Sequence, residues 1–232
     1  MDFTIRNQAV VEIFGVQIGI TETMVSTWII MGVLIAFAVV VKIKSRNFKE
    51  VPKGFQNVVE ALVEAFENYL YSTAGGKLMF LGNWYFTVFV FVLISNISGL
   101  FGLRPPTADW SLTVSLAIIT FLLIQAMGIM FGKTKYLKSF VEPYYLSFLF
   151  LPMNVIGELA RPISLSFRLF GNILAGTIMM SLLYTMAPIF MQIGLPGALH
   201  GYFDLFAGVL QTYIFVTLSL SFISGAAAVG DA

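Results

Sequence analysis

The stretch SFRLFGNILAG, Ser166–Gly176, places one arginine, Arg168, inside a long apolar run. The run covers residues 148–187, and its part 153–187 would be about 52 Å long as a helix, whereas the hydrocarbon core of a bilayer is ~30 Å thick. A helix of that length spans the core only if it tilts by roughly 55° or if its ends protrude. We therefore predict a long, steeply tilted membrane helix with a positive charge near its middle.

The composition is that of an integral membrane protein. Of the 232 residues, 58% are hydrophobic and 11% are charged, whereas about a quarter of a typical soluble domain is charged. The net charge of +1 gives no reason to expect nucleic-acid binding. Cysteine is absent, which excludes disulfides, a thiol nucleophile and thiolate metal sites.

The usual sequence marks of an enzyme are also missing. We find no HExxH, no GxSxG and no glycine-rich phosphate loop, so we expect no cofactor and no metal, and an intramembrane enzyme has little support. The first residues, MDFTIRNQAVVEIF, do not have the pattern of a cleaved signal or transit peptide. We expect the chain to insert uncleaved, as one membrane domain over residues 1–232.

Several apolar runs are long enough to cross a membrane, which takes roughly 20 helical residues. They lie at 24–41, 84–103, 112–131, 148–187 and 196–225. This pattern predicts an all-α integral membrane protein with five transmembrane helices. The fifth run, like the fourth, is longer than an upright helix needs, so it should also tilt steeply. Pro152, Pro162 and Pro188 mark possible bends.

Basic residues follow the first and third runs directly. They are Lys42, Lys44, Arg46, Lys49 and Lys53 after the first run, and Lys133, Lys135 and Lys138 after the third. Because cytoplasmic loops carry an excess of lysine and arginine, both of these ends should be cytoplasmic. The segment 1–23 should then lie outside, and the C-terminus should lie in the cytoplasm after a fifth crossing.

The segment 54–71 has a different pattern, with an apolar and a polar stripe at helical spacing. The apolar stripe is Phe55, Val58, Val59, Leu62, Phe66, Tyr69 and Leu70, and the polar stripe is Gln56, Glu60, Glu64 and Glu67. We expect an amphipathic helix on the cytoplasmic surface of the membrane. Its polar face is either only solvated or a docking surface for another protein.

Arg168 needs a counter-charge. An arginine at mid-bilayer costs ~2.5 to 3.5 kcal/mol on the insertion scale, and guanidinium cannot escape this cost by losing its proton. The residues three and four positions away, Ser164, Leu165, Gly171 and Asn172, carry no charge. The structural alternative is an arginine that snorkels to the interface, but apolar sequence extends past it on both sides. Its partner must therefore come from elsewhere.

Polar residues in the last two runs fall on helical faces. Arg168 and Asn172 share a face in the fourth run, next to small residues that allow close helix contact. In the fifth run Asp204, Gly208 and Gln211 share another face by the same spacing. Two such faces on consecutive helices could line an aqueous path. The alternative is that Asn172 and Gln211 only form hydrogen bonds between helices.

Other polar residues near these runs have simpler explanations. Glu158 and Arg161, at i and i+3, can pair with each other. Asp109 stands just ahead of the third run, where capping a helix N-terminus is favoured over a role in transport. His200, four residues before Asp204, should lie near the outer interface, and a proton-relay role for it stays open.

Taken together, these residues resemble subunit a of the F-type ATP synthase. The resemblance rests on ELARPISLSFRLFGNILAG (Glu158–Gly176) and LQTYIFVTLSLSFIS (Leu210–Ser224), with support from SRNFKEVPKGFQNVVEALVE and RPPTADWSLTVSLA. It covers nearly the whole chain. The RLFGN core is similar to bacterial or plastid members, which implies a bacterial plasma membrane protein.

The resemblance implies a stator that is not catalytic on its own. In this family, two inclined helices lie against a rotating ring of c subunits and leave two offset half-channels, so that H⁺ or Na⁺ flow is coupled to ATP synthesis. Arg168 matches the arginine that attracts each ionised ring carboxylate and blocks leakage, and Asn172 and Gln211 match polar positions beside it. The surface helix matches one that meets the peripheral stalk, subunit b.

The sequence departs from the family pattern at two positions. Many relatives carry a glutamate nine residues after the arginine, where this chain has Thr177. At the position of Asp204, other members have His or a different polar group. A hydroxyl does not titrate near neutral pH, so Asp204 becomes the candidate carboxylate of the outer half-channel. The ion, H⁺ or Na⁺, stays open.

A different class of function also fits a buried arginine and aspartate. A stand-alone ion-coupled transporter or channel would contain the same charges, but such proteins often have repeats with broken helices, which this sequence lacks. A stator should copurify with other ATP synthase subunits, namely a ring-forming proteolipid and stalk proteins. A transporter should conduct ions when reconstituted alone.

Overall fold

The computed structural model describes residues 7–13, 16–141, 147–186 and 194–229. Within these residues, five helical stretches are long and apolar enough to cross a membrane. They are Glu22–Ser45, Gly76–Phe101, Trp110–Ser139, Ser147–Met186 and Leu195–Ala228. The prediction of an all-α integral membrane protein with five spanning helices is confirmed.

Three of the spans are built from shorter helical pieces. The first span is α1 (Glu22–Ser45), and the fourth is α6 (Ser147–Met186). The second span joins η1 (Gly76–Leu81), α3 (Gly82–Ile97) and η2 (Ser98–Phe101). The third span joins α4 (Trp110–Met127), the π-helical η4 (Gly128–Gly132) and α5 (Lys133–Ser139). The fifth span joins α7 (Leu195–His200), the π-helical η6 (Gly201–Ala207) and α8 (Gly208–Ala228). A short 3-10 turn, η3 (Pro106–Ala108), precedes α4.

The N-terminal region adds a feature that the sequence analysis did not predict. Strands β1 (Asn7–Ile13) and β2 (Val16–Thr21) pair antiparallel, with Ile13 opposite Val16. Both strands are rich in β-branched residues, which favour extended backbone. The hairpin leads directly into α1, where Thr21 caps the helix by accepting a hydrogen bond from the Met24 backbone N–H.

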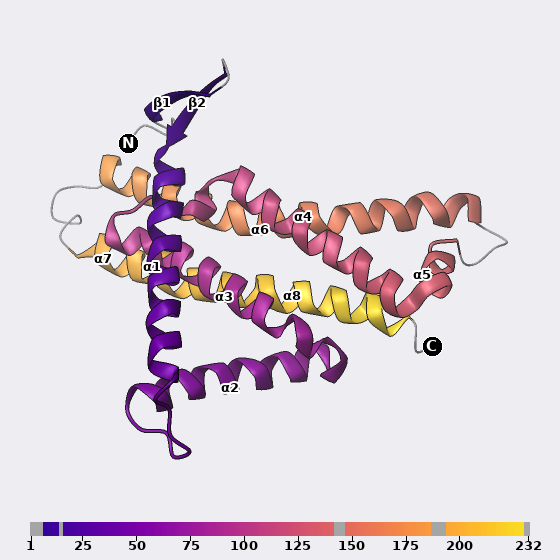
Figure 1. Ribbon diagram of the computed structural model, residues 1–232. Helices are drawn as coiled ribbons and strands as arrows, with labels where there is room; N and C mark the ends of the chain where they lie inside the picture. The colour runs from indigo at the N-terminus through magenta and orange to yellow at the C-terminus, as the bar shows by residue number, and fades with distance from the viewer. Residues whose placement is uncertain (1–6, 14–15, 142–146, 187–193, 230–232) are drawn as a thin grey trace.

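The last two spans run crosswise to the first. Figure 1 shows α6 and α8 lying side by side along most of their length and crossing α1 steeply. The 40 residues of α6 form one helix with Pro152 and Pro162 inside it, so α6 is about 60 Å long. If α1 crosses a membrane upright, a helix of the length and direction of α6 inclines within that membrane or protrudes from it. The predicted bend at Pro188 lies outside the described residues.

Helix α2 (Phe55–Ala74) is the predicted amphipathic helix. It lies at the end of α1 opposite the hairpin (Figure 1), and its Phe66 and Leu70 side chains are buried. One residue of the polar stripe is covered by the preceding loop: Gln56 is buried, and its side chain bonds both the backbone N–H and the carbonyl of Lys49 as well as the Glu60 carboxylate of the same stripe. The Lys49 backbone needs these partners because the chain turns there, outside any helix.

A hydrogen bond fastens α2 to the fifth span. The hydroxyls of Tyr69 and Thr217 lie 2.7 Å apart. Because the Thr217 hydroxyl donates to the Tyr213 carbonyl, the Tyr69 hydroxyl is the donor to Thr217. Burial raises the pKa of the Tyr69 phenol above its ordinary value, so the donor keeps its proton at neutral pH.

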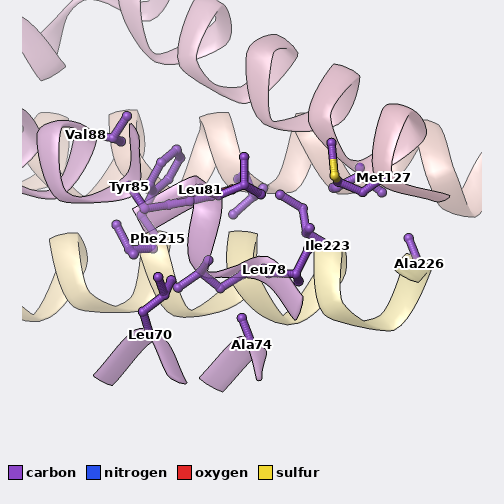
Figure 2. Close-up of a cluster of buried hydrophobic side chains, with 14 of the residues drawn as sticks. Leu70, Ala74, Leu78, Leu81, Tyr85, Val88, Met127, Phe215, Ile223 and Ala226 are labelled. Carbon is purple, nitrogen blue, oxygen red and sulfur yellow. The ribbon is translucent and has the colours of Figure 1, made fainter. Parts of the chain in front are cut away.

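Helix α8 is the centre of the packing. Figure 2 shows side chains of α2, η1 and α3 gathered around Phe215 and Ile223 of α8, with Met127 of α4 nearby. Of the most apolar part of each span, 44% is buried in the fifth and 11% in the first. The position of α8 is therefore set by protein contacts, whereas most of α1 is left uncovered by the described chain.

Candidate functional site

The middle of α6 and the start of the fifth span enclose an open cleft of about 480 Å³. Arg168, Asn172 and Gln211 are among its lining residues, as the sequence analysis predicted for a shared site. The other lining residues are uncharged: Phe167, Gly171, Tyr202, Phe206, Ala207, Leu210 and Ile214. The cleft is thus a mainly apolar groove that contains one permanent positive charge.

Arg168 has no counter-charge in the part of the chain that the structure describes. Its side chain is exposed at the cleft, and no ion pair or hydrogen bond joins it to any described residue. The two described acids on the last two spans, Glu158 and Asp204, each bind a different residue. The charge of Arg168 is therefore uncompensated within the described residues.

Gln211 supplies a second unpaired donor beside the arginine. The residue is 5% exposed, and its side-chain Nε2 has no hydrogen-bond partner within the described structure. A buried polar group without a partner costs roughly 1–3 kcal/mol. The cleft therefore presents the Arg168 guanidinium with no acidic lining residue, which suits an anionic partner, and the unpaired Gln211 amide is buried beside it.

Asp204 lies at a different place from the cleft. Its Oδ2 is 2.6 Å from Nδ1 of His200, and the His200 ring lies 3.4 Å from the Tyr184 hydroxyl of α6. His200 and Asp204, four residues apart, therefore contact each other directly. Among the described residues, no group of three or more acidic or histidine side chains gathers to hold a metal ion.

The predicted common face of Asp204, Gly208 and Gln211 is wrong for Gln211. Asp204 and Gly208 face the second span, next to Gly99 and Asn96, whereas Gln211 lines the cleft. Asp204 lies within the π-helical turn η6, whose i→i+5 bonds widen the helix and shift the side chains off ordinary α-helical spacing. Gly208 and Gln211, however, both lie in the α-helix α8, three residues and about 60° apart around its axis, so one can face the second span while the other faces the cleft.

A buried asparagine that the sequence analysis missed ties the second span to the fifth. The Asn96 amide donates to the Gly208 carbonyl at 3.1 Å and to the Thr212 hydroxyl at 3.0 Å, and its oxygen accepts from Thr107 at 2.7 Å. A polar residue in an apolar span is a signal that could have indicated it. The network fixes the start of α8 next to the π-helical turn.

A second polar cluster occupies the other end of the fourth span. Arg161 Nη1 and Glu158 Oε1 lie 2.5 Å apart, which is the predicted i,i+3 pair. Gln125 donates to Glu158 at 3.3 Å and accepts from Tyr136 at 3.1 Å. Arg161 also lies over the Phe222 ring, 5.1 Å from its centroid. The cluster borders a cavity of about 520 Å³ between α5, α6 and α8.

Two predicted residues have local roles in the structure. The Thr177 hydroxyl donates to the Ile173 carbonyl one turn back along α6. Asp109 caps α4 by accepting from the Ser111 backbone N–H, and it also accepts from Thr23 of α1 at 3.0 Å. Capping, the favoured explanation for Asp109, is therefore observed.

Comparison with known proteins shows the family of this chain. Residues 24–224 match the family model described as "ATP synthase A chain". The "ATP synthase subunit a, sodium ion specific" of Propionigenium modestum is 37% identical, with 100% of this chain and 81% of that protein covered. The "ATP synthase subunit a" of Moorella thermoacetica is 36% identical, with 92% and 94% covered, and that of Desulfosudis oleivorans is 34% identical, with 86% and 85% covered. The chain belongs to the ATP synthase A chain family.

Proposed function

We propose that this chain is the ion-translocating stator subunit in the membrane sector of an F-type ATP synthase, and that the cleft at Arg168 faces a rotating ring of c subunits. The observation that carries the proposal is a permanent cation without a counter-charge among the described residues, next to the unpaired amide of Gln211. A carboxylate on a neighbouring subunit would supply the missing counter-charge of the exposed Arg168. The family does not favour a stand-alone transporter or channel.

The positive charge of Arg168 makes a ring carboxylate release its bound ion. At about 4 Å, an effective dielectric constant near 20 gives roughly 4 kcal/mol of attraction between guanidinium and carboxylate. That energy is worth about a thousandfold preference for the ionised carboxylate. A ring carboxylate that reaches Arg168 therefore releases its ion, and the half-buried Asn172 offers it a further hydrogen bond. The same positive charge repels a cation that would otherwise cross directly between the half-channels.

The two polar clusters support separate access from opposite sides. Asp204 and His200 lie in the first part of the fifth span, whereas Glu158 and Arg161 border a cavity with Gly225 and Ala226 near its C-terminal end. We assign the outer half-channel to the first cluster, with Asp204 as its carboxylate, and the cytoplasmic one to the second. Thr177 is given no relay role, because its hydroxyl is bonded within α6.

The proposed location is a bacterial plasma membrane, with the hairpin outside and α2 and the C-terminus in the cytoplasm. The basic residues that follow α1 support this orientation. On α2, the side chains of Glu60, Glu64 and Glu67 are exposed. This acidic face is the proposed contact with the peripheral stalk, subunit b. The subunit itself carries ions, and catalysis is assigned to other subunits of the complex.

The experiment compares Arg168→Ala with the unaltered chain in the assembled complex. In inverted vesicles, we expect Arg168→Ala to reduce ion-driven ATP synthesis by about a hundredfold or more, while ring and stalk proteins still copurify. Synthesis near the unaltered rate would contradict the proposal. So would purification without a ring-forming proteolipid, together with ion conduction by the chain alone.

A further inference from the structure

Gly99, in the last turn of the second span, lies directly against Asp204. A Cβ atom placed on Gly99 would lie 3.2 Å from Cγ and Oδ2 of Asp204 and 3.4 Å from its Oδ1. These are the three nearest atoms, and all belong to the Asp204 carboxyl group. The Asp204 carboxylate thus occupies the space that a side chain at position 99 would take.

The hydrogen bonds of Asn96 hold the two positions together. Asn96 lies three residues before Gly99, is fully buried, and bonds the Gly208 carbonyl and the Thr212 hydroxyl. A Cβ on Gly208 would lie 3.1 Å from Cβ of Asn96, so the helices meet here at close range. Because this contact lies about one turn from the Gly99 and Asp204 pair on each span, the spans cannot slide past each other there.

We propose that Gly99 is a positioning residue of the ion path: its missing side chain leaves room for the Asp204 carboxylate between the second and fifth spans, pointing toward His200. This inference rests on the proposed function and names the point at which the outer half-channel presents its cation-binding group. The path then needs a carboxylate at this place, whichever of the two helices carries it.

The geometry predicts a local effect of adding a methyl group. The Gly99 backbone is not among the described glycines with positive φ, so alanine fits its conformation. The atoms that the methyl group would touch are the end of a flexible side chain. Gly99→Ala should therefore leave the fold intact, turn the carboxylate away and break its 2.6 Å contact with His200.

The first test measures ATP-driven ion uptake by inverted vesicles that hold the assembled complex. We expect Gly99→Ala to slow uptake by about tenfold, with the ring still copurifying. The matched control is Gly32→Ala, because a Cβ on this α1 glycine meets nothing within 4 Å. Equal uptake by Gly99→Ala and Gly32→Ala would overturn the inference.

The second test moves the carboxylate from one helix to the other. Asp204→Gly alone should lose most uptake, and the double change of Gly99→Asp with Asp204→Gly should recover it by roughly tenfold. A purely structural role of Gly99 would give no recovery, because the double change fills the glycine site and empties the aspartate site. Uptake by the double variant no greater than that of Asp204→Gly would overturn the inference.

Arg168→Ala in the same assay separates this inference from the proposed function. If Arg168→Ala pumps at the unaltered rate, the stator function itself fails. If Arg168→Ala abolishes pumping while the Gly99 variants behave like their controls, the stator function stands and only the role of Gly99 is wrong.

Discussion

Arg161 and Arg168 lie two helical turns apart on α6, yet only Arg161 has a counter-charge within the described chain. Arg161 pairs with Glu158 and lies over the Phe222 ring. Arg168 faces a cleft without any acidic lining residue. A cation with its own partner is part of the structure of one subunit, whereas a cation without one is arranged for a partner on another subunit.

The largest expected effect is that of replacing Arg168 by lysine, and the same replacement of Arg161 is its comparison. Lysine at 168 keeps the charge but loses the planar fork of donors, and in an apolar cleft it can release its proton. We expect Arg168→Lys to reduce ATP synthesis by about a hundredfold. At position 161 the Glu158 carboxylate can bind an ammonium group, so Arg161→Lys should stay within roughly threefold of the unaltered rate. Synthesis rates in inverted vesicles measure both, and equal losses would remove the distinction between the two arginines.

The second prediction concerns the role of Asp204 in ion flow and whether Asp204 neutralises Arg168. We expect Asp204→Asn to slow ion flux by about tenfold or more, because the amide cannot exchange an ion at neutral pH. Thr177→Ala should change the flux much less, since the Thr177 hydroxyl only bonds within its own helix. Flux is measured in vesicles with an ion-sensitive dye.

The double variant supplies the control for that prediction. If Asp204 neutralised Arg168, combining Arg168→Ala with Asp204→Asn would restore part of the function. We expect no restoration. An effect of Thr177→Ala as large as that of Asp204→Asn would discard Asp204 as the outer carboxylate.

The smallest effect concerns the pair at Arg161. Glu158→Gln leaves Arg161 without its carboxylate in a half-buried position, which should destabilise the chain by about 1 kcal/mol. Adding Arg161→Gln should recover most of that loss, because the unpaired charge is then gone. The melting temperature of the purified complex reports both changes. No recovery in the double variant would show that Arg161 does not depend on Glu158.

Local sequence rules predicted much of this molecule. Apolar length predicted the five spans, although α1 continues to Ser45 beyond the predicted boundary at 41, because Lys42 and Lys44 suit the negative end of a helix dipole. The i,i+3 spacing predicted the Glu158 and Arg161 pair. These features depend on residues that are close along the chain.

The remaining features depend on contacts between distant segments. Gln125 reaches Glu158 across 33 positions of sequence, and Asn96 reaches Thr212 across 116. The π-helical turn that carries Asp204 is packed against η2 at Gly99, and no period in the sequence marks it. Side-chain spacing alone therefore could not predict which residues of the fifth span face the cleft.

The hydrogen bond between Tyr69 and Thr217 has a mechanical consequence under the proposed function. A turning rotor pushes back on the stationary helix that it passes, and α8 is that helix. Because Tyr69 and the buried Phe66 and Leu70 join α2 to the core around α8, the recoil reaches the cytoplasmic surface through packed side chains. Tightly packed side chains deform little under force, so little of the torque is lost in bending loops.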